Sequence, residues 1–212
     1  MMRRYRTMLG AGICWLLGIA AAGGVMLEKE ALTFDGRNAL PAFTLRQPLA
    51  GTFTVQLKLR LRAWPADGKE EFSRTSPAGV VLLQGRPEAG ECLIRVLGKR
   101  LQLHLRGSAA KGQGAMARGE LPLGEWVRLA LVHTGAETVL YADGAAVAAL
   151  PVPPGAGPWS RIVAGQELGG IRLLQGEIRE LRVIDRALSA AEVKRAFRGS
   201  GAPSPLPGAR GQ

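Results

Sequence analysis

Glu177 and Glu180 are three residues apart in GEIRELRVI, a segment with the composition of a strand. Two carboxylates flanking a glycosidic bond are the groups that most glycoside hydrolases use. In a regular strand, however, side chains alternate between faces, so these two point in opposite directions unless a β-bulge intervenes. Arg179 and Arg182 would also lower the pKa of both carboxylates, which is unfavourable for a general acid. We therefore predict no catalytic residues and a protein that is not an enzyme.

The histidines and cysteines offer no alternative catalytic or metal-binding arrangement. His104 and His133 are the only histidines, each stands alone, and no Cys/His cluster has zinc-ligand spacing. Cys92 alternates with apolar residues in ECLIRV, which indicates a buried thiol rather than a reactive one. We predict neither a metal site nor a cofactor.

Basic side chains that alternate outward on two predicted strands are the candidate ligand-binding residues. They are Lys58, Arg60, Arg62, His104 and Arg106. Such groups recognise the carboxylate, sulfate and phosphate groups of acidic polymers. If the two strands are neighbours, the five residues form one basic face. That face carries no aromatic residue for stacking on a sugar ring, and aromatics are only 5% of the chain, which is low for a lectin.

The elements that position these residues are mostly short strands. Residues 52–63 alternate between apolar and polar without a break, which is typical of a long strand with one buried face. Asp143 and Gly144 stand between two apolar runs and predict a hairpin turn. The sequence SAAE at 189–192 predicts a capping box that opens a helix over 190–198. About ten strands with turns between them predict an all-β, antiparallel β-sandwich with one short C-terminal helix.

Both ends of the chain differ from this body. Three arginines in MMRRYRT precede an uncharged apolar run over 8–27, which is typical of an export signal. The run is either a signal peptide cut after Ala22 or Gly24, or an uncleaved apolar helix that anchors the protein in a membrane. Both interpretations place the protein outside the cytoplasm. The predicted segments are a signal or anchor at 1–27, a folded domain at 31–198 and a disordered tail at 199–212.

The chain is strongly basic, with a formal net charge of +11, or about +8 without Arg3, Arg4 and Arg6. This charge suits an acidic partner, although arginines spread over every surface explain it equally well. No run of four basic residues exists, and we predict no nucleic-acid partner.

Three stretches together resemble the LamG-like, concanavalin A-like lectin/glucanase family of jelly-roll domains. They are LTFDGRNAL (32–40), GEWVRLALVHTGAETVLYADGAAVAAL (124–150) and LQGEIRELRVIDRALSAAEVKRAF (174–197). The family typically has a Phe-Asp-Gly turn, a Gly-x-Trp strand, a Tyr-x-Asp-Gly hairpin and a closing Gly-x-Ile strand. The resemblance covers nearly all of the predicted domain and implies a jelly-roll fold. Trp126 of the Gly-x-Trp strand is expected to pack in the core or at its rim rather than to bind sugar.

The resemblance also implies where calcium would bind. Many family members hold one ion near an acidic residue of the closing strand, which often reads Gly-x-Ile-Asp-Glu. Here Arg179 stands at the Asp position, so a cation replaces the usual oxygen ligand. Asp35 remains in the opening turn, where we expect it to stabilise the turn. Arg179 is expected to pair with Asp35 or Glu180 and to take the structural place of the ion.

Two functions fit these observations. The first is an exported, non-catalytic module that binds an acidic glycan or another polymer of the cell envelope. The second is a structural or protein-interaction ectodomain of a membrane-tethered protein, with no glycan ligand.

Overall fold

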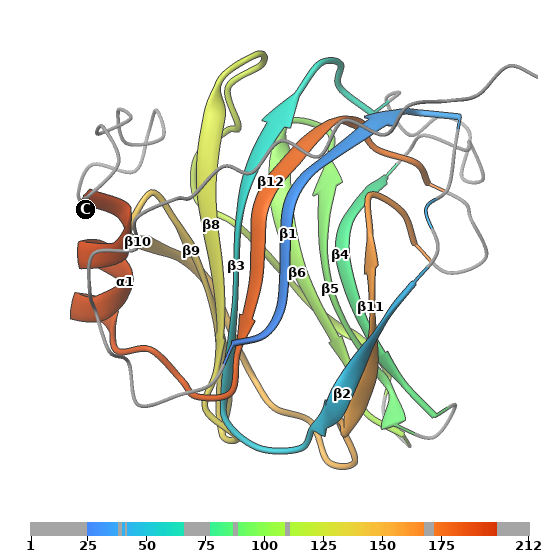
Figure 1. The fold of residues 1–212 in the computed structure, drawn as a ribbon, viewed down its shortest axis with the longest axis vertical. Coiled ribbons are helices and arrows are strands. Elements are labelled where there is room, and N and C mark those ends of the chain that lie inside the picture. Colours follow the sequence, from blue (N-terminus) through green and yellow to red (C-terminus); the bar gives the residue numbers. More distant parts are fainter. Residues whose placement is uncertain are drawn as a thin grey trace, which may run out of the picture.

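The computed structural model describes residues 25–37, 40, 42–65, 77–86, 89–108, 111–167 and 172–198, which form two antiparallel sheets packed face to face (Figure 1). Sheet A contains, in spatial order, β1 (Val25–Asp35), β12 (Gln175–Ile184), β3 (Phe53–Leu61), β8 (Trp126–His133), β9 (Glu137–Ala142) and β10 (Ala145–Pro151). Sheet B contains β2 (Phe43–Leu49), β11 (Trp159–Ala164), β4 (Ala78–Gly85), β5 (Glu91–Leu97), β6 (Arg100–Arg106) and β7 (Gln113–Met116). The predicted all-β sandwich with one short C-terminal helix is confirmed.

Strand β3 shows how the sequence pattern forms a sheet with one buried face. Val55, Leu57 and Leu59 are buried, whereas the intervening polar side chains are partly exposed on the outer face of sheet A. β3 lies between β12 and β8 and pairs with both in antiparallel register. Its outward side chains therefore have neighbours on two sides.

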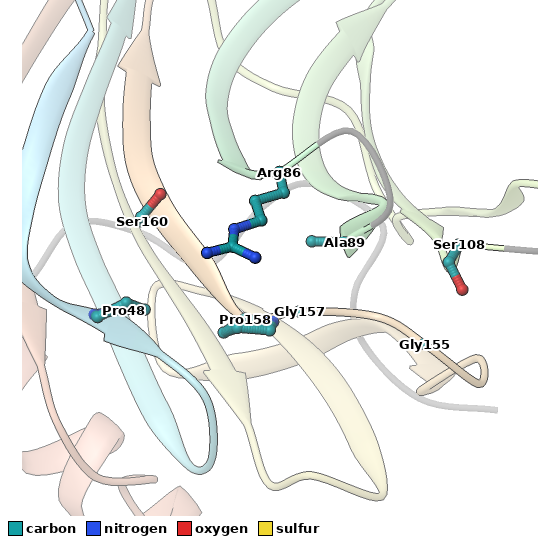
Figure 2. Close-up of a pocket in the computed structure, with 8 residues that line it drawn as sticks. All are labelled: Pro48, Arg86, Ala89, Ser108, Gly155, Gly157, Pro158 and Ser160. Carbon is teal, nitrogen blue, oxygen red and sulfur yellow. The ribbon is translucent and has the colours of Figure 1, made fainter.

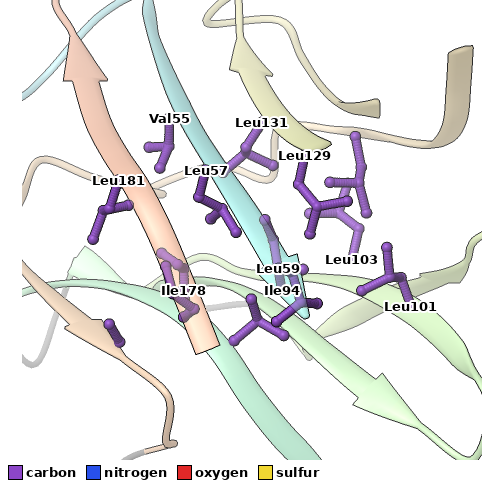
Figure 3. Packing of buried hydrophobic residues seen from close by; sticks show 14 of the residues in the cluster. Val55, Leu57, Leu59, Ile94, Leu101, Leu103, Leu129, Leu131, Ile178 and Leu181 are labelled. Atoms are coloured by element: carbon purple, nitrogen blue, oxygen red, sulfur yellow. The ribbon is translucent and has the colours of Figure 1, made fainter. Parts of the chain in front are cut away.

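The core fills the space between the two sheets (Figure 3). Leucines of β3 and β8 in sheet A and of β6 in sheet B belong to one buried cluster, and Phe34, Phe53 and Trp159 are the largest buried aromatic side chains. Cys92 is completely buried, as predicted, and burial raises the pKa of its thiol far above the usual value.

Helix α1 (Ala190–Arg198) covers part of the outer face of sheet A (Figure 1). Its predicted capping box is present: the Glu192 carboxylate accepts hydrogen bonds from the Ser189 N–H and hydroxyl, each at 2.8 Å. Val193 and Phe197 pack on Ala130 and Val132 of β8. The helix therefore does not cover the ends of β12 and β3 that lie farthest from it, and the outer face of sheet A is open there.

One edge strand of each sheet carries residues that oppose further strand pairing. β1 at one edge of sheet A has three consecutive charged residues, Glu28, Lys29 and Glu30. β2 at one edge of sheet B contains Pro48, which has no N–H to donate.

The predicted signal or anchor lies mostly outside the described residues, as do residues 199–212 of the predicted tail. Residues 25–27, which we assigned to the apolar segment, instead begin β1, so the first strand starts at Val25 rather than at the predicted domain boundary, Ala31. Among the described residues, no helix is long and apolar enough to cross a membrane.

Candidate functional site

The five predicted ligand-binding residues do not share one face. Lys58, Arg60 and Arg62 lie on or directly after β3 in sheet A, whereas His104 and Arg106 lie on β6 in sheet B. All five point away from the core, and the outer faces of the two sheets point in opposite directions. The condition for one basic face, that these two strands are neighbours, is not met, because side-chain alternation indicates a face but not the sheet to which it belongs.

On sheet A, three arginines converge on the carboxylate of Glu177. Glu177 lies opposite Arg60 in the β12–β3 ladder, and its Oε1 accepts hydrogen bonds from Arg60 at 2.5 Å and Arg62 at 2.7 Å. Arg179 donates to Oε2 at 3.3 Å. The Glu177 side chain is only 6% exposed, and the hydrogen bonds from Arg60 and Arg62 lower its pKa to about 2. The group is therefore a carboxylate at neutral pH, with surplus positive charge around it.

Trp126 completes this group of residues, which we call the Glu177 cluster: Glu177, Arg60, Arg62, Arg179 and Trp126. The partly exposed indole lies opposite Arg60 in the β3–β8 ladder. The guanidinium carbons of Arg60 and Arg179 are each 4.7 Å from the ring centre. The prediction that this face has no aromatic residue is thus wrong, and Trp126 lies on the outer face of sheet A, outside the buried core.

Arg179 and Asp35, both among the described residues, do not form the ion pair with each other that was one of the expected arrangements. We expected Arg179 to pair with Asp35 or Glu180, but its ion pair is with Glu177. Asp35 accepts a hydrogen bond from the Arg37 N–H at 2.8 Å, in agreement with its predicted role in a turn.

A β-bulge brings Glu180 to the same face as Glu177. The β12–β3 register shifts between Arg179 and Arg182, and Glu180 has a φ of 51°. Glu180 accepts a hydrogen bond at 2.5 Å from Lys58, which shares a face with Arg60. The opposite orientation expected of the two glutamates in a regular strand therefore does not apply, because the bulge named as the exception is present. The pKa of Glu177 is lowered as predicted, to about 2, but by Arg60 and Arg62 rather than by Arg179 and Arg182. Glu177 therefore has no proton to donate at neutral pH.

On sheet B, His104 and Arg106 share a single carboxylate. Glu91 on β5 lies 3.7 Å from His104 Nε2 and 3.5 Å from Arg106 Nη2. Burial, followed by the positive charge of Arg95, lowers the pKa of His104, so the imidazole is neutral at neutral pH. The Glu91–Arg106 pair is therefore neutral overall, whereas the Glu177 cluster carries surplus positive charge.

A groove of about 760 Å³ lies at one end of the sandwich, apart from both surfaces (Figure 2). It is lined by Pro48, Arg86, Ala89, Ser108, Gly155, Gly157, Pro158 and Ser160. These residues come from β2, from the ends of β4 and β6, and from the loop that leads into β11. None of them was predicted, because no local pattern relates segments so far apart in the sequence.

The architecture is shared with a known superfamily. The family model described as the concanavalin A-like lectin/glucanases superfamily matches residues 35–194. The chain belongs to this superfamily. Its jelly-roll fold is the one that the sequence resemblance implied.

Several solved structures are similar to this chain in fold. A heptameric SAP-like pentraxin from Limulus polyphemus is 20% identical, with a TM-score of 0.59 over 84% of this chain and 86% of the pentraxin. The binding domain of Paraclostridial Mosquitocidal Protein 1 is 14% identical, with a TM-score of 0.57 over 82% of this chain and 47% of that one. A structure of botulinum neurotoxin type C is 11% identical, with a TM-score of 0.55 over 74% of this chain and 39% of that one. The chain thus spans less than half of these two toxin chains, and the likeness concerns the fold alone. No curated protein sequence matches the chain.

In this lectin/glucanase-like module, Arg179 stands where the sequence resemblance implied an acidic calcium ligand. Arg179 contributes a guanidinium that is already paired with Glu177, and it supplies no oxygen ligand. Among the described residues, no group of three His, Cys, Asp or Glu side chains is arranged to hold a metal ion.

Proposed function

We propose that this concanavalin A-like module is an exported, non-catalytic domain that binds an acidic glycan or another anionic polymer of the cell envelope. The proposed site is the Glu177 cluster on the outer face of sheet A. The observation that carries the proposal is the convergence of three guanidinium groups on one carboxylate beside a partly exposed indole.

The charge of the cluster favours an anionic ligand. Arg60, Arg62 and Arg179 carry three positive charges, and Glu177 carries one negative charge. The Arg62 and Arg179 side chains are 57% and 49% exposed, so both have N–H groups that a ligand can reach. A planar guanidinium can donate two parallel hydrogen bonds to a carboxylate or sulfate. Lys58 lies beside the cluster, but its short ion pair with Glu180 makes it a weaker candidate.

Trp126 gives the same surface an apolar component. The flat faces of sugar rings pack on aromatic side chains, and an anionic substituent on the sugar would then lie near the arginines. Among the proteins with this fold, botulinum neurotoxin type C depends on interaction with two ganglioside molecules for cell entry. Glycan recognition by a protein containing this fold is consistent with the proposal.

Export and the absence of catalysis belong to the same proposal. The basic, then apolar, N-terminal sequence supports export, and the protein is expected outside the cytoplasm. The low pKa of Glu177 supports a binding role rather than a catalytic one. We propose no nucleic-acid partner.

The proposal is tested by titrating the protein with a sulfated or uronate-rich oligosaccharide and with a neutral oligosaccharide of equal length. We expect binding of the acidic ligand only, with affinity that falls as salt increases. Arg179→Ala should weaken binding about tenfold.

Arg106→Ala is the matched control for Arg179→Ala. The two side chains have nearly equal exposure, 47% and 49%, and pair with glutamates at 3.5 Å and 3.3 Å, but they lie on opposite faces. An equal loss of binding in both variants, or a loss in Arg106→Ala alone, would contradict the proposed site.

A structural or protein-interaction ectodomain is the second candidate. Its support is that the Glu177 cluster satisfies its own ion pairs without a ligand. Absence of binding to every acidic glycan tested, together with a protein partner recovered by crosslinking at this face, would favour it.

A further inference from the structure

We infer that the groove of Figure 2 is a second binding site, separate from the Glu177 cluster, and that it takes a sugar residue bearing a carboxylate. The inference concerns different residues at a different end of the sandwich and does not rest on the proposed function.

Arg86 is the anionic anchor of the proposed site. In Figure 2 its side chain extends into the groove, with its guanidinium between Ser160, Ala89 and Pro158. Within the described part of the chain this guanidinium makes no ion pair or hydrogen bond, in contrast to the paired arginines of the Glu177 cluster. An exposed guanidinium of this kind can donate two hydrogen bonds to an incoming carboxylate without breaking an existing pair.

The rest of the groove suits a polyhydroxylated ring. The hydroxyl groups of Ser108 and Ser160 flank the groove and can donate to or accept from sugar hydroxyls. The pyrrolidine rings of Pro48 and Pro158 provide apolar surface for the C–H face of a sugar. The volume of about 760 Å³ falls within the range of ligand sites and leaves room for a neighbouring sugar of the same chain.

The walls of the groove are held together by backbone contacts. The Gly157 N–H donates to the Ala89 carbonyl at 2.7 Å. A Cβ atom at Gly85 would lie 2.2 Å from the Pro158 carbonyl oxygen, and one at Gly107 would lie 2.1 Å from the Pro154 carbonyl oxygen. The absence of side chains at these glycines lets the loop rest directly on the ends of β4 and β6. A site held in this way loses little conformational entropy when a ligand binds.

An acidic peptide is the competing ligand class, and the structure disfavours it. Peptides commonly bind to exposed sheet edges by adding a strand, which requires backbone hydrogen bonds along the edge. The edge strand beside the groove is β2, where Pro48 has no N–H to donate.

The inference is tested on the full chain by NMR and calorimetric titration with methyl β-D-glucuronoside and its neutral counterpart, methyl β-D-glucoside. We expect saturable binding of the glucuronoside, with amide shift changes centred on Ser108, Gly155 and Gly157. The neutral glycoside should bind at least about tenfold more weakly, because it cannot pair with the guanidinium. Arg86→Ala should remove this preference, and Arg86→Lys should restore part of it.

Arg179→Ala is the control that separates this site from the Glu177 cluster. Binding at the groove should be unchanged in Arg179→Ala, even if that variant loses the acidic polymer. Because Arg86 makes no ion pair with the described residues, its replacement should also leave the melting temperature unchanged, which verifies that the variant is folded. Equal affinity for the two glycosides, no saturable shift at the groove, or tighter competitive binding of triglutamate would each overturn the inference.

Discussion

Arg60 and Trp126 face each other across β3 and β8, and the Arg60 guanidinium carbon lies 4.7 Å from the centre of the indole ring. Arg179 reaches the same ring from β12 at the same distance. The electron-rich face of an indole attracts a guanidinium by roughly 0.5–1 kcal/mol at an exposed site. Trp126 and Glu177 together therefore hold like charges close to one another on one face of the sheet.

Replacing Trp126 should loosen this arrangement. We expect Trp126→Ala to lower the free energy of unfolding by about 1–2 kcal/mol, since two cation–π contacts are lost. Trp126→Phe retains a ring and should lose less. Urea unfolding of both variants measures the difference, and equal stability of the two would show that the ring itself does not stabilise the arginines.

The pKa of Glu177 predicts a pH dependence at the acidic end. Its folded-state pKa of about 2 lies below the usual value of 4.5, so its stabilising effect is fully present above pH 4.5 and is lost as the pH falls toward 2. Glu177→Gln should be less stable than the native chain at pH 7, and the difference should shrink between pH 4.5 and pH 2. Glu192, whose pKa is also about 2, contributes equally to the stability of both proteins. A difference in stability between the two proteins that persists below pH 2 would contradict the ion-pair explanation.

The lowered pKa of His133 predicts that the stability of the fold also depends on pH in a second, higher range. Burial lowers its pKa from 6.5 to about 4, and its ring stacks on Phe53 and contacts Thr138 Oγ1 at 2.8 Å. The unfolded chain therefore binds a proton that the folded chain does not, and stability falls as the pH decreases from 6.5 to 4. His133→Gln should flatten this decline, as measured by urea unfolding at several pH values. His104→Gln separates the contribution of the other histidine, and an unchanged slope in His133→Gln would contradict the assignment.

We expect Arg128 to stabilise the packing of helix α1 on sheet A. This side chain is buried on β8, and its Nη1 donates to the backbone carbonyl of Phe197 in the last turn of the helix. Arg128→Met should lower the free energy of unfolding by about 2 kcal/mol, because the carbonyl loses a charged donor. Hydrogen exchange of α1 should accelerate in this variant but not in the exposed control Arg195→Met. Equal exchange in the two variants would mean that Val193 and Phe197 suffice to dock the helix.

Local patterns in the sequence predict the strands well where one face meets water. The alternation over 52–63 predicts β3 and its buried side chains, and Asp143 and Gly144 do form the predicted turn, with φ angles of 47° and 85°. Strands β1, β2 and β7 were not predicted. The start of β1 was assigned to the apolar N-terminal segment, and Pro48 and Gly114 interrupt the short segments of β2 and β7, which lack a clear alternation.

The candidate site was harder to predict, because it depends on relationships between strands. The alternation of apolar and polar residues indicates which side chains of a strand share a face, but it does not indicate that β3 and β6 belong to different sheets. In β8, every residue after Trp126 is buried, since α1 covers the outer side of that strand, so no alternation marks Trp126 as outward-facing. The bulge at Glu180 has no signature in GEIRELRVI, although it decides where that carboxylate lies.

The charged and proline-bearing edge strands affect how copies of this module would behave when crowded. β1 presents Glu28, Lys29 and Glu30 in succession, and β2 presents Pro48. Neighbouring molecules on one polymer would meet at edges that oppose a continuous intermolecular sheet. We therefore expect many copies of the module bound to one polymer to dissociate on dilution, without the formation of fibrils.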